Sequence, residues 1–282
     1  MYVFVSDMFV EDYIGGGELT TEAIISGTDL PVIKIHSSRV DVNTIDALKD
    51  RHWIFGNYAN MKMPIILHCC KNLEYSVIEY DYKFCSYRLP QKHIEAEGAC
   101  GCESSSHGKL VSAFMSNAKS LWFMSHAQKD LYIEKFPFLN KRELLVLSSV
   151  FAEDTLDSIL SRNIENKNDT WLIQNSPSWV KGTRDAIKFA LDNNLQYELF
   201  GGITHDEVLD KFSKHKGFIF LPKGFDTCPR TVIEAKLLGC ELIMNDNVQH
   251  KNESWFSGEK KEVTDYLRKR TSVFWNKLSE YT

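Results

Sequence analysis

Short apolar runs alternate along the chain with stretches in which apolar residues recur at helical spacing. The runs are rich in β-branched and aromatic residues, which is typical of buried parallel strands in βαβ units. Strands are therefore predicted over residues 2–5, 32–35, 53–56, 65–68, 76–80, 121–124, 144–150, 171–174, 197–200, 217–222 and 240–244. Helices are predicted over residues 183–194, 205–215 and 231–239. The alternation predicts an α/β fold with doubly wound parallel sheets.

A polar segment interrupts this rhythm at residues 158–170. We place a linker between about residues 150 and 170, because polar stretches without periodicity are typical of connections. The 282 residues suit two domains of ordinary size, which we expect over residues 1–155 and 156–282. Apolar residues recur in part at helical spacing over residues 263–282, which predicts a final helix packing back on the first domain.

The composition is that of a globular protein, with 43% hydrophobic and 25% charged residues. Its 33 basic and 38 acidic residues give a net charge of −5, so no overall field favours nucleic acid. The seven cysteines, two of them adjacent at Cys69 and Cys70, form no regular disulfide framework and favour reduced thiols in the cytoplasm. No secretion signal opens the sequence and no apolar run approaches about 20 residues, so neither export nor a transmembrane segment is expected.

The stretch DTCPRTVIEAKLLGC at residues 226–240 combines two acids and an arginine around the start of a predicted helix. Proline is tolerated in a first helical turn and glycine is favoured after a helix end, so we expect a helix from Pro229 to Leu238 with Gly239 as its terminator. In doubly wound sheets, ligands bind beyond the carboxyl ends of the strands, where helix N-termini attract anions. The stretch therefore predicts an anion-binding turn.

Each charged residue of this turn suits a different part of a nucleotide ligand. Arg230 offers a guanidinium fork for phosphate oxygens, Glu234 a carboxylate for vicinal hydroxyls such as those of ribose, and Asp226 an acceptor for the hydroxyls of a further group. The neighbours expected to line the same turn are Thr227, Cys228, Pro229 and Thr231. The alternative is that Asp226 caps the helix while Arg230 and Glu234 form an (i, i+4) pair worth about 0.2–0.5 kcal/mol. Spacing alone leaves both interpretations open.

The longer stretch DTCPRTVIEAKLLGCELI resembles the C-terminal signature of the family-four-type glycosyltransferases, which have the GT-B fold. In that signature an acidic residue is followed, eight positions later, by Glu-Ala, which places Asp226 and Glu234 on the two acids. The resemblance implies two Rossmann-like domains facing a cleft. It also implies that Asp226 lies beside the donor sugar and that Glu234 holds the nucleotide ribose.

Three further segments resemble the family in the same order along the chain. After the first strand comes a glycine run that could form a ligand-facing loop, although a glycine run alone is more often a simple turn; it consists of Gly15, Gly16 and Gly17. Residues 118–136 resemble the strand and helix that close the first domain. In residues 176–187 the resemblance places Lys181 on the lysine that binds the donor diphosphate. Ser176 stands where the family has an arginine, whose phosphate contact Arg184 or Arg230 could replace.

The resemblance implies a glycosyltransferase that moves a hexose or pentose from a nucleotide diphosphate sugar to an acceptor hydroxyl. Retention of the anomeric configuration and catalysis without a metal are expected, with Lys181 and Arg230 stabilising the leaving diphosphate. Where the family has a histidine near the reaction centre, the candidates are Asp81 and Lys83. The acceptor is expected to be a surface glycan or a lipid-linked sugar, then a small molecule.

Two alternatives remain open. A hydroxylated base in DNA could be the acceptor, or the chain could be a catalytically silent module that only binds nucleotide sugars. An oxidoreductase is disfavoured, because no Gly-x-Gly-x-x-Gly follows the first strand.

The loop around residues 93–107 contains residue types that bind zinc, namely Cys100 and Cys102 between His93 and His107. Their spacing matches no common zinc pattern, so we favour an insertion loop near the acceptor cleft over a structural metal site or a redox pair. Asp246 stands between two asparagines and does not form the Asp-x-Asp motif of other glycosyltransferases, so no metal site is predicted. Basic residues near the C-terminus are expected on a solvated helix face or, alternatively, against an anionic acceptor or membrane surface: Lys260, Lys261, Arg268, Lys269 and Arg270.

Overall fold

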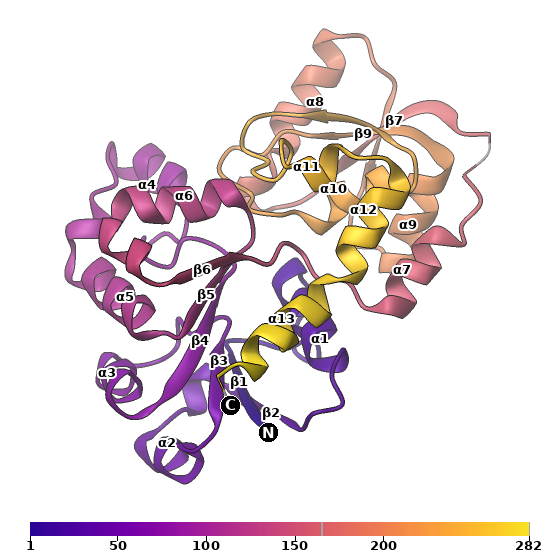
Figure 1. The fold of residues 1–282 in the computed structure, drawn as a ribbon. Coiled ribbons are helices and arrows are strands. Elements are labelled where there is room, and N and C mark those ends of the chain that lie inside the picture. Colours follow the sequence, from indigo (N-terminus) through magenta and orange to yellow (C-terminus); the bar gives the residue numbers. More distant parts are fainter. Residues whose placement is uncertain (165, 282) are drawn as a thin grey trace. The chain divides into compact units, whose positions relative to one another are not determined.

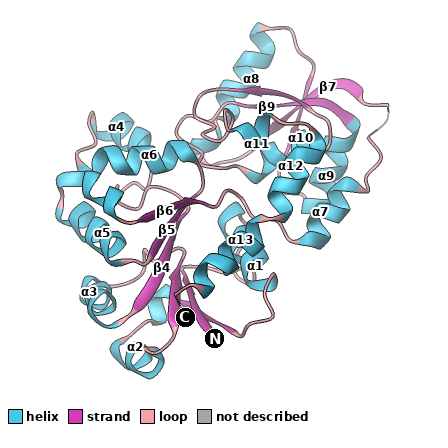
Figure 2. Ribbon diagram, viewed as in Figure 1, coloured by secondary structure: helices cyan, strands magenta, loops and turns pink. Residues whose placement is uncertain are grey.

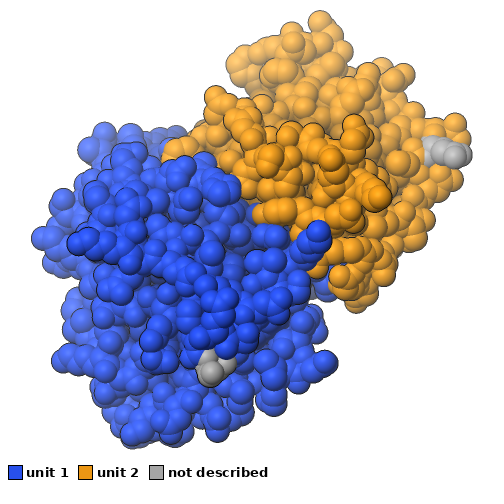
Figure 3. Space-filling view, in the orientation of Figure 1, with its two compact units in different colours: residues 1–152, 269–282 blue, residues 153–268 orange. Residues whose placement is uncertain are grey.

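The computed structural model describes residues 1–164 and 166–281. The chain divides into two compact units, coloured separately in Figure 3. Unit 1 comprises residues 1–152 and 269–282, and unit 2 comprises residues 153–268. Each unit is built on one parallel β-sheet flanked by helices, which confirms the predicted α/β class (Figures 1 and 2).

Six strands form the sheet of unit 1 in the order β2-β1-β3-β4-β5-β6, and all neighbouring pairs are parallel. The strands are β1 (Tyr2–Ser6), β2 (Val32–His36), β3 (His52–Phe55), β4 (Glu74–Glu79), β5 (Ser120–Phe123) and β6 (Glu143–Val146). The chain reverses its direction across the sheet between β1 and β3, which makes this the topological switch point. In sheets of this kind, ligands bind beyond the carboxyl ends of the strands at that point.

Helices cover both faces of this sheet (Figure 1). They are α1 (Gly16–Ser26), α2 (Val42–Leu48), α3 (Met63–Asn72), α4 (Pro90–Glu97), α5 (Ser106–Asn117), α6 (His126–Lys135) and α13 (Arg270–Ser279), with short 3₁₀ turns at η1 (Ser37–Arg39), η2 (Cys102–Ser104) and η3 (Pro137–Lys141). On one face, Phe114 of α5 stacks on Tyr75 of β4, with ring centroids 4.6 Å apart. On the other face, the Trp275 ring of α13 meets Tyr2 of β1 at 4.9 Å. Because both faces are covered, strand residues of either parity are apolar and β1 and β3 are buried throughout.

The predicted strand over residues 65–68 is wrong, because these residues lie in α3. Pro64 stands at the first turn of this helix, where the missing N–H of proline costs nothing. Ile66 and Cys69 are buried whereas Leu67 is 43% exposed, so one stripe of the helix faces the core. The apolar run was therefore the buried side of a helix, which a run this short does not distinguish from a strand.

Four parallel strands form the sheet of unit 2 in the order β10-β9-β7-β8. They are β7 (Asn168–Gln174), β8 (Tyr197–Phe200), β9 (His215–Phe220) and β10 (Glu241–Met244). The switch point of this sheet lies between β7 and β9. The helices are α7 (Glu153–Leu160), α8 (Thr183–Asp192), α9 (His205–Lys214), α10 (Arg230–Leu237), α11 (Ser254–Ser257) and α12 (Lys260–Arg268), and η4 (Trp179–Lys181) is a 3₁₀ turn. Among the residues that the structure describes, no helix has both the length and the apolar character needed to cross a membrane.

The boundaries between the units differ from those expected. The break falls between residues 152 and 153 instead of 155 and 156. The last residues of the chain return to unit 1, as expected, but from residue 269 and not from residue 263. The expected linker over 150–170 contains helix α7, whose buried Leu156 and Ile159 lie one turn apart. The single helix expected over 263–282 is two helices, α12 and α13, which end and begin around Lys269.

The C-terminal helix α13 is anchored in unit 1 by an aromatic side chain. Trp275 is 7% exposed, and its indole N–H donates to the carbonyl of Ile24 at 2.8 Å. Phe274 packs on Trp122 of β5 with ring centroids 4.9 Å apart. The helix therefore supplies part of the core of unit 1, and α1 and α13 lie side by side in Figure 1.

Replacing this anchor should destabilise unit 1. We expect Trp275→Ala to lower the free energy of unfolding by about 3–5 kcal/mol, because it removes a buried ring and leaves a cavity. Native-state hydrogen exchange of the amides in β1 and β3 measures the change. Val273→Ala is the control, since Val273 lies on the same helix and is 38% exposed. Equal exchange rates in the two variants would contradict this account of α13.

Candidate functional site

The loop after β7 in unit 2 contains a glycine that no other residue could replace without strain. Gly182 has a φ of +62°, in the left-handed region. A Cβ atom at this position would lie 1.8 Å from the carbonyl oxygen of Leu221. The Lys223 N–H donates to the carbonyl of Val180 at 3.0 Å. The loops that follow β7 and β9 are therefore in backbone contact, directly at the switch point of the sheet.

This contact brings together two of the predicted site residues. Lys181 Nζ lies 2.7 Å from Asp226 Oδ2, and the side chains are 27% and 13% exposed. Asp226 is held by its own backbone, because its N–H donates to Asn247 at 2.8 Å and its carbonyl accepts from Gln249 at 3.1 Å. The pair is thus fixed at the carboxyl edge of the sheet and remains accessible to solvent through the lysine.

The other two charges of the predicted turn lie on α10 and are more deeply buried. Arg230 is 7% exposed and Glu234 is 1% exposed, with Arg230 Nε 3.9 Å from Glu234 Oε1. Burial lowers the pKa of Arg230, although the charge of Glu234 opposes this shift. The (i, i+4) pair of the alternative interpretation is therefore present. The helix cap of that interpretation is absent, because Pro229 and not Asp226 is the N-cap residue of α10 and Asp226 pairs with Lys181.

Glu234 has a second partner that the sequence did not reveal. His205 Nε2 lies 2.9 Å from Glu234 Oε1, within hydrogen-bond distance. A capping box formed by Thr204 and Glu207 sets the start of α9 and thereby positions His205. The histidine side chain is 37% exposed, so the buried carboxylate of Glu234 is in contact with a side chain that solvent or a ligand can reach.

A pocket of about 530 Å³ adjoins these loops in unit 2. It is lined by residues 175–179, 182–184, 187 and 223, which include Trp179 and Ser176. Arg184 also lines the pocket, whereas Arg230 is buried. Of the two arginines expected to replace the family's missing one, Arg184 is therefore the more accessible.

The other residues predicted to line the anion-binding turn are mostly enclosed. Thr227, Cys228 and Pro229 are buried, and Thr231 is half-buried.

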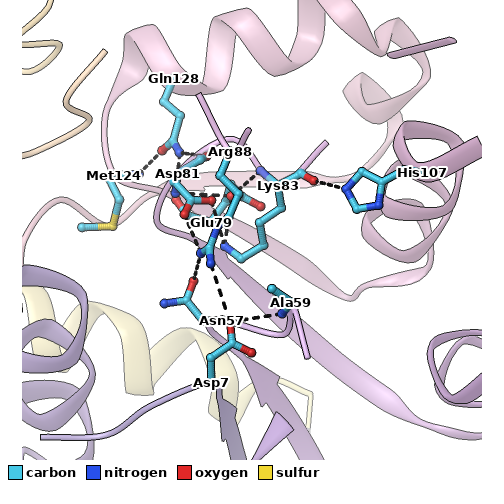
Figure 4. Close-up of polar contacts among 10 residues, drawn as sticks. All are labelled: Asp7, Asn57, Ala59, Glu79, Asp81, Lys83, Arg88, His107, Met124 and Gln128. Atoms are coloured by element: carbon cyan, nitrogen blue, oxygen red, sulfur yellow. Dashed lines mark hydrogen bonds and ion pairs between the residues drawn. The ribbon is translucent and has the colours of Figure 1, made fainter. Parts of the chain in front are cut away.

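Unit 1 carries a second polar cluster at the carboxyl ends of β1, β3 and β4, shown in Figure 4. Arg88 is its centre: its Nη2 atom lies 2.5 Å from Asp81 Oδ2 and donates to Asn57 Oδ1 at 2.7 Å, and its Nη1 atom lies 3.7 Å from Asp7 Oδ2. The backbone of Arg88 has a φ of +55°, which is uncommon for a residue with a side chain. The predicted candidate Asp81 follows β4, and its ion pair with Arg88 links it to Asp7 and Asn57 at the switch point of this sheet.

Asp7 organises the β1 side of this cluster. It follows β1 directly and accepts hydrogen bonds from Ser37 Oγ at 2.5 Å and from the backbone N–H groups of Ala59 and Asn60, each at 3.2 Å. The glycine run opens α1 next to it, and a Cβ atom on Gly17 would lie 3.9 Å from the Asn57 amide. Gly15 is the N-cap residue and Gly16 and Gly17 are the first helical residues. A ligand contact by this run stays a prediction.

Beneath Arg88 lies a buried ion pair between Glu79 and Lys83. Lys83 Nζ donates to Glu79 Oε1 at 3.0 Å, and the two residues are 4% and 0% exposed, respectively. Burial raises the pKa of Glu79 from its ordinary 4.5 to about 7, although the Lys83 ammonium opposes this shift. Glu79 Oε2 has no hydrogen-bond partner among the described residues. The amide of Gln128 donates to the carbonyls of Glu79 and Asp81 at 2.9 and 2.7 Å, which fixes this turn (Figure 4).

Comparison with solved structures identifies the fold. The E. coli trehalose-6-phosphate protein bound with UDP-2-fluoro glucose is 10% identical, covers 95% of this chain and 90% of its own, and has a TM-score of 0.56. The lipopolysaccharide outer core galactosyltransferase WaaB is also 10% identical, with coverages of 96% and 90% and a TM-score of 0.53. The chain has the GT-B fold.

Other comparisons add less to this GT-B assignment. A UDP-forming α,α-trehalose-phosphate synthase from Burkholderia xenovorans is 9% identical, with coverages of 82% and 68% and a TM-score of 0.47. No family model and no curated protein sequence matches the chain.

Four residues of the two polar clusters in this GT-B chain were missed by sequence reasoning: Asp7, Glu79, Arg88 and His205. Asp7 and Glu79 could have been found, because each is an acid at the end of a buried apolar run. Arg88 lies in an irregular loop and His205 directly follows one. Hydrophobic periodicity does not predict where such loops place a side chain.

The loop of residues 93–107 is divided by the structure. His107 Nε2 lies 2.8 Å from the carbonyl of Lys83 and joins the polar cluster, whereas His93, Cys100 and Cys102 gather elsewhere. Asp246 is exposed and pairs with Lys251. Of the basic C-terminal residues, Arg268 pairs with Glu153 and Asp157 within unit 2.

The buried carboxyl of Glu79 should make stability depend on pH. The unfolded chain loses this proton near pH 4.5, whereas the folded chain keeps it up to about pH 7. Its contribution to stability is therefore fully present below pH 4.5 and is lost as the pH rises through about 7. Glu79→Gln cannot ionise, so we expect its unfolding free energy to fall less than that of the unchanged chain between about pH 5 and about pH 8.

Urea unfolding of the full chain at several pH values measures this difference. Asp29→Asn, at an exposed acid of the same unit, is the matched control and should keep the pH dependence of the unchanged chain. Parallel pH profiles for Glu79→Gln and the unchanged chain would show that Glu79 ionises normally.

Proposed function

We propose that this chain is a glycosyltransferase that moves a sugar from a nucleotide diphosphate sugar to an acceptor hydroxyl. The observation that carries the proposal is the Lys181–Asp226 pair, which lies at 2.7 Å on the two loops at the switch point of unit 2. A cation suits the phosphate of such a donor, and a neighbouring carboxylate, which accepts hydrogen bonds from hydroxyls, suits its sugar. The names of the two fold neighbours, a galactosyltransferase and a protein bound with UDP-2-fluoro glucose, support the same reaction class.

Stabilisation of the leaving group is the main chemical task of unit 2 in this proposal. When the glycosidic bond breaks, negative charge develops on the nucleoside diphosphate. We assign the direct phosphate contacts to Lys181 and to the first backbone N–H groups of α10, where a helix N-terminus favours anions. Arg230 is only 7% exposed and lies 3.9 Å from Glu234, so we assign it a supporting positive charge beneath the turn. Arg184, which lines the pocket, is the arginine that a ligand could reach.

The remaining groups of unit 2 fit the other parts of the donor. Asp226 accepts from hydroxyls of the sugar, and its pairing with Lys181 holds it next to the phosphate contact. Glu234, with His205 at 2.9 Å, accepts from the ribose hydroxyls. The pocket of about 530 Å³ lies in the size range of small-ligand sites and contains the half-buried Trp179, which suits a nucleobase.

We assign the acceptor to unit 1. Its polar cluster collects Asp7, Asp81 and Arg88 at the switch point of the sheet, and these groups suit a molecule rich in hydroxyls. Asp81 is the candidate base for the acceptor hydroxyl. A glycan or a lipid-linked sugar is the acceptor class we favour, since one fold neighbour is named as a transferase of the lipopolysaccharide outer core.

Binding and turnover can be tested together. A thermal-shift panel of nucleotide diphosphate sugars should show one preferred donor, because a ligand at about 100 times its Kd stabilises the folded state by about 2.7 kcal/mol. With that donor, Lys181→Met should lower the rates of transfer and of slow donor hydrolysis by about 10²–10³-fold, because a preorganised cation is lost.

Lys188→Met is the control for this variant, since Lys188 lies on α8 of the same unit and its side chain is 75% exposed. Full transfer activity in Lys181→Met would overturn the phosphate assignment. Donor binding without any hydrolysis or transfer in the unchanged chain would instead indicate a silent binding module.

We further propose that the reaction retains the anomeric configuration and needs no divalent cation, because the positive charges assigned to the diphosphate are side chains, Lys181 and Arg184. Proton NMR of the first-formed product should show the donor's anomeric configuration. Omitting Mg²⁺ and Mn²⁺ from the buffer should leave the initial rate unchanged. An inverted product, or a rate that depends on added Mg²⁺, would refute the respective part.

A further inference from the structure

Four potential metal ligands converge in unit 1. None of them belongs to the polar cluster of Figure 4, although they lie on the same stretch of chain. The sulfurs of Cys85, Cys100 and Cys102 and a ring nitrogen of His93 all lie within 4.8 Å of one another. Cys85 lies in the turn after β4, His93 in α4, Cys100 in the loop that leads into η2, and Cys102 is the first residue of η2. Three of the four residues are buried, and Cys100 is half-buried.

Three distances between these atoms are close to those of a tetrahedral zinc site. Zinc–sulfur bonds of about 2.3 Å and zinc–nitrogen bonds of about 2.0–2.1 Å, at tetrahedral angles, place two sulfurs about 3.8 Å apart and a sulfur and a nitrogen about 3.5 Å apart. Here the Cys85 and Cys100 sulfurs are 3.7 Å apart. His93 Nδ1 lies 3.5 Å from the Cys85 sulfur and 3.2 Å from the Cys102 sulfur.

A disulfide explains this arrangement less well. A disulfide bond has a sulfur–sulfur distance of about 2.05 Å, whereas Cys85 and Cys100 are 3.7 Å apart. All the cysteines of the described chain are free. A disulfide would use only two of the three sulfurs and would leave the inward-facing imidazole nitrogen unexplained.

We propose that Cys85, His93, Cys100 and Cys102 bind one Zn²⁺ ion in a structural, tetrahedral site. Four protein ligands close the coordination sphere, as in structural rather than catalytic zinc sites. On binding, the three thiols lose their protons to solvent, and the thiolates and the neutral imidazole donate their electron pairs to the ion. The ion has no part in the glycosyl transfer proposed above, and the inference does not depend on that function.

The surroundings of His93 orient it for this role. Its other ring nitrogen, Nε2, lies 3.0 Å from Glu97 Oε2, one helical turn further along α4. Tyr87 stacks on the imidazole with ring centroids 4.7 Å apart, and its hydroxyl donates to Glu97 at 2.8 Å. A carboxylate that accepts from Nε2–H leaves Nδ1 unprotonated and directed at the sulfurs, which is the usual arrangement around zinc-bound histidines.

The site would hold the turn that carries Arg88. The Cys85 N–H donates to the Tyr82 carbonyl at 2.9 Å, and the Arg88 N–H donates to the Cys85 carbonyl at 2.8 Å. Fixing Cys85 therefore fixes the short turn in which Arg88 adopts its left-handed backbone conformation. The zinc ion would thus link the loop of residues 98–105 to the base of the polar cluster.

Elemental analysis of the full chain, purified without a histidine tag and without chelators, tests the proposal. We expect about one zinc ion per chain, and its loss in Cys100→Ser, whose half-buried position favours a folded variant. Cys70→Ser is the matched control, because Cys70 is also a half-buried free cysteine of unit 1 and lies outside the cluster. Zinc retained in Cys100→Ser and in Cys85→Ser, or no zinc in the unchanged chain even after incubation with Zn²⁺, would overturn the site.

A second measurement does not depend on removing a ligand. Co²⁺ bound in place of zinc should give the intense ligand-field bands of tetrahedral thiolate coordination, and Zn²⁺ should displace it. Glu97→Gln should lower the zinc affinity by about 10–100-fold in this competition while leaving the spectrum tetrahedral. An octahedral cobalt spectrum, or an intact mass two hydrogens lower that indicates a disulfide, would overturn the proposal.

Discussion

In each unit, the carboxyl ends of parallel strands meet at one edge of the sheet, and the rest of the molecule is arranged around this constraint. Both faces of the sheets are covered by helices, so polar side chains can be placed at little cost only where strands end. The loops at the two switch points carry them: Asp7 and Asn57 after β1 and β3, and Lys181 and Asp226 after β7 and β9. The position of the polar clusters is therefore a consequence of topology, and their chemistry is a consequence of which residues occupy those loops.

Two of the charged pairs at these edges are buried, and burial argues against a purely stabilising role. Glu79 and Lys83 are almost fully enclosed, as are Arg230 and Glu234. Replacing a buried ion pair by apolar residues is often neutral or even stabilising, because desolvation of the charges offsets their attraction. Each pair does, however, hold a neighbouring half-buried group in place. Glu79 accepts from the backbone of Asp81 at 3.3 Å, and Glu234 holds His205 at 2.9 Å. The buried pairs are best understood as supports for the accessible residues of the two clusters.

Much of the fold, and part of the site, could be predicted from the sequence. Buried strands and helices can be predicted where apolar runs are bounded by proline or glycine. The strand that ends at Phe220 and the helix that begins at Arg230 are an example. The run at residues 65–68 failed because a short apolar segment has no measurable period. The partners of the predicted residues could not be predicted either, because they depend on which loops meet in space. His205 lies 29 positions from Glu234, and Lys181 lies 45 positions from Asp226. Cys85 was not predicted as a ligand, because its spacing to His93 matches no common ligand pattern and the two residues meet only in the folded chain.

The two units hold the loops of their polar clusters by different physical means. In unit 2 the backbone itself does so, because only a glycine at residue 182 allows the loop to touch the carbonyl of Leu221. Unit 1 has longer connections after β4, and backbone contacts alone do not order a long polar loop against its conformational entropy. There the amide of Gln128 holds the Glu79 turn on one side, and the cluster of Cys85, His93, Cys100 and Cys102 lies on the other. A bound ion at that cluster would supply the ordering free energy that a glycine contact supplies in unit 2. It would also explain why two buried thiols and one half-buried thiol converge next to a loop that carries Arg88.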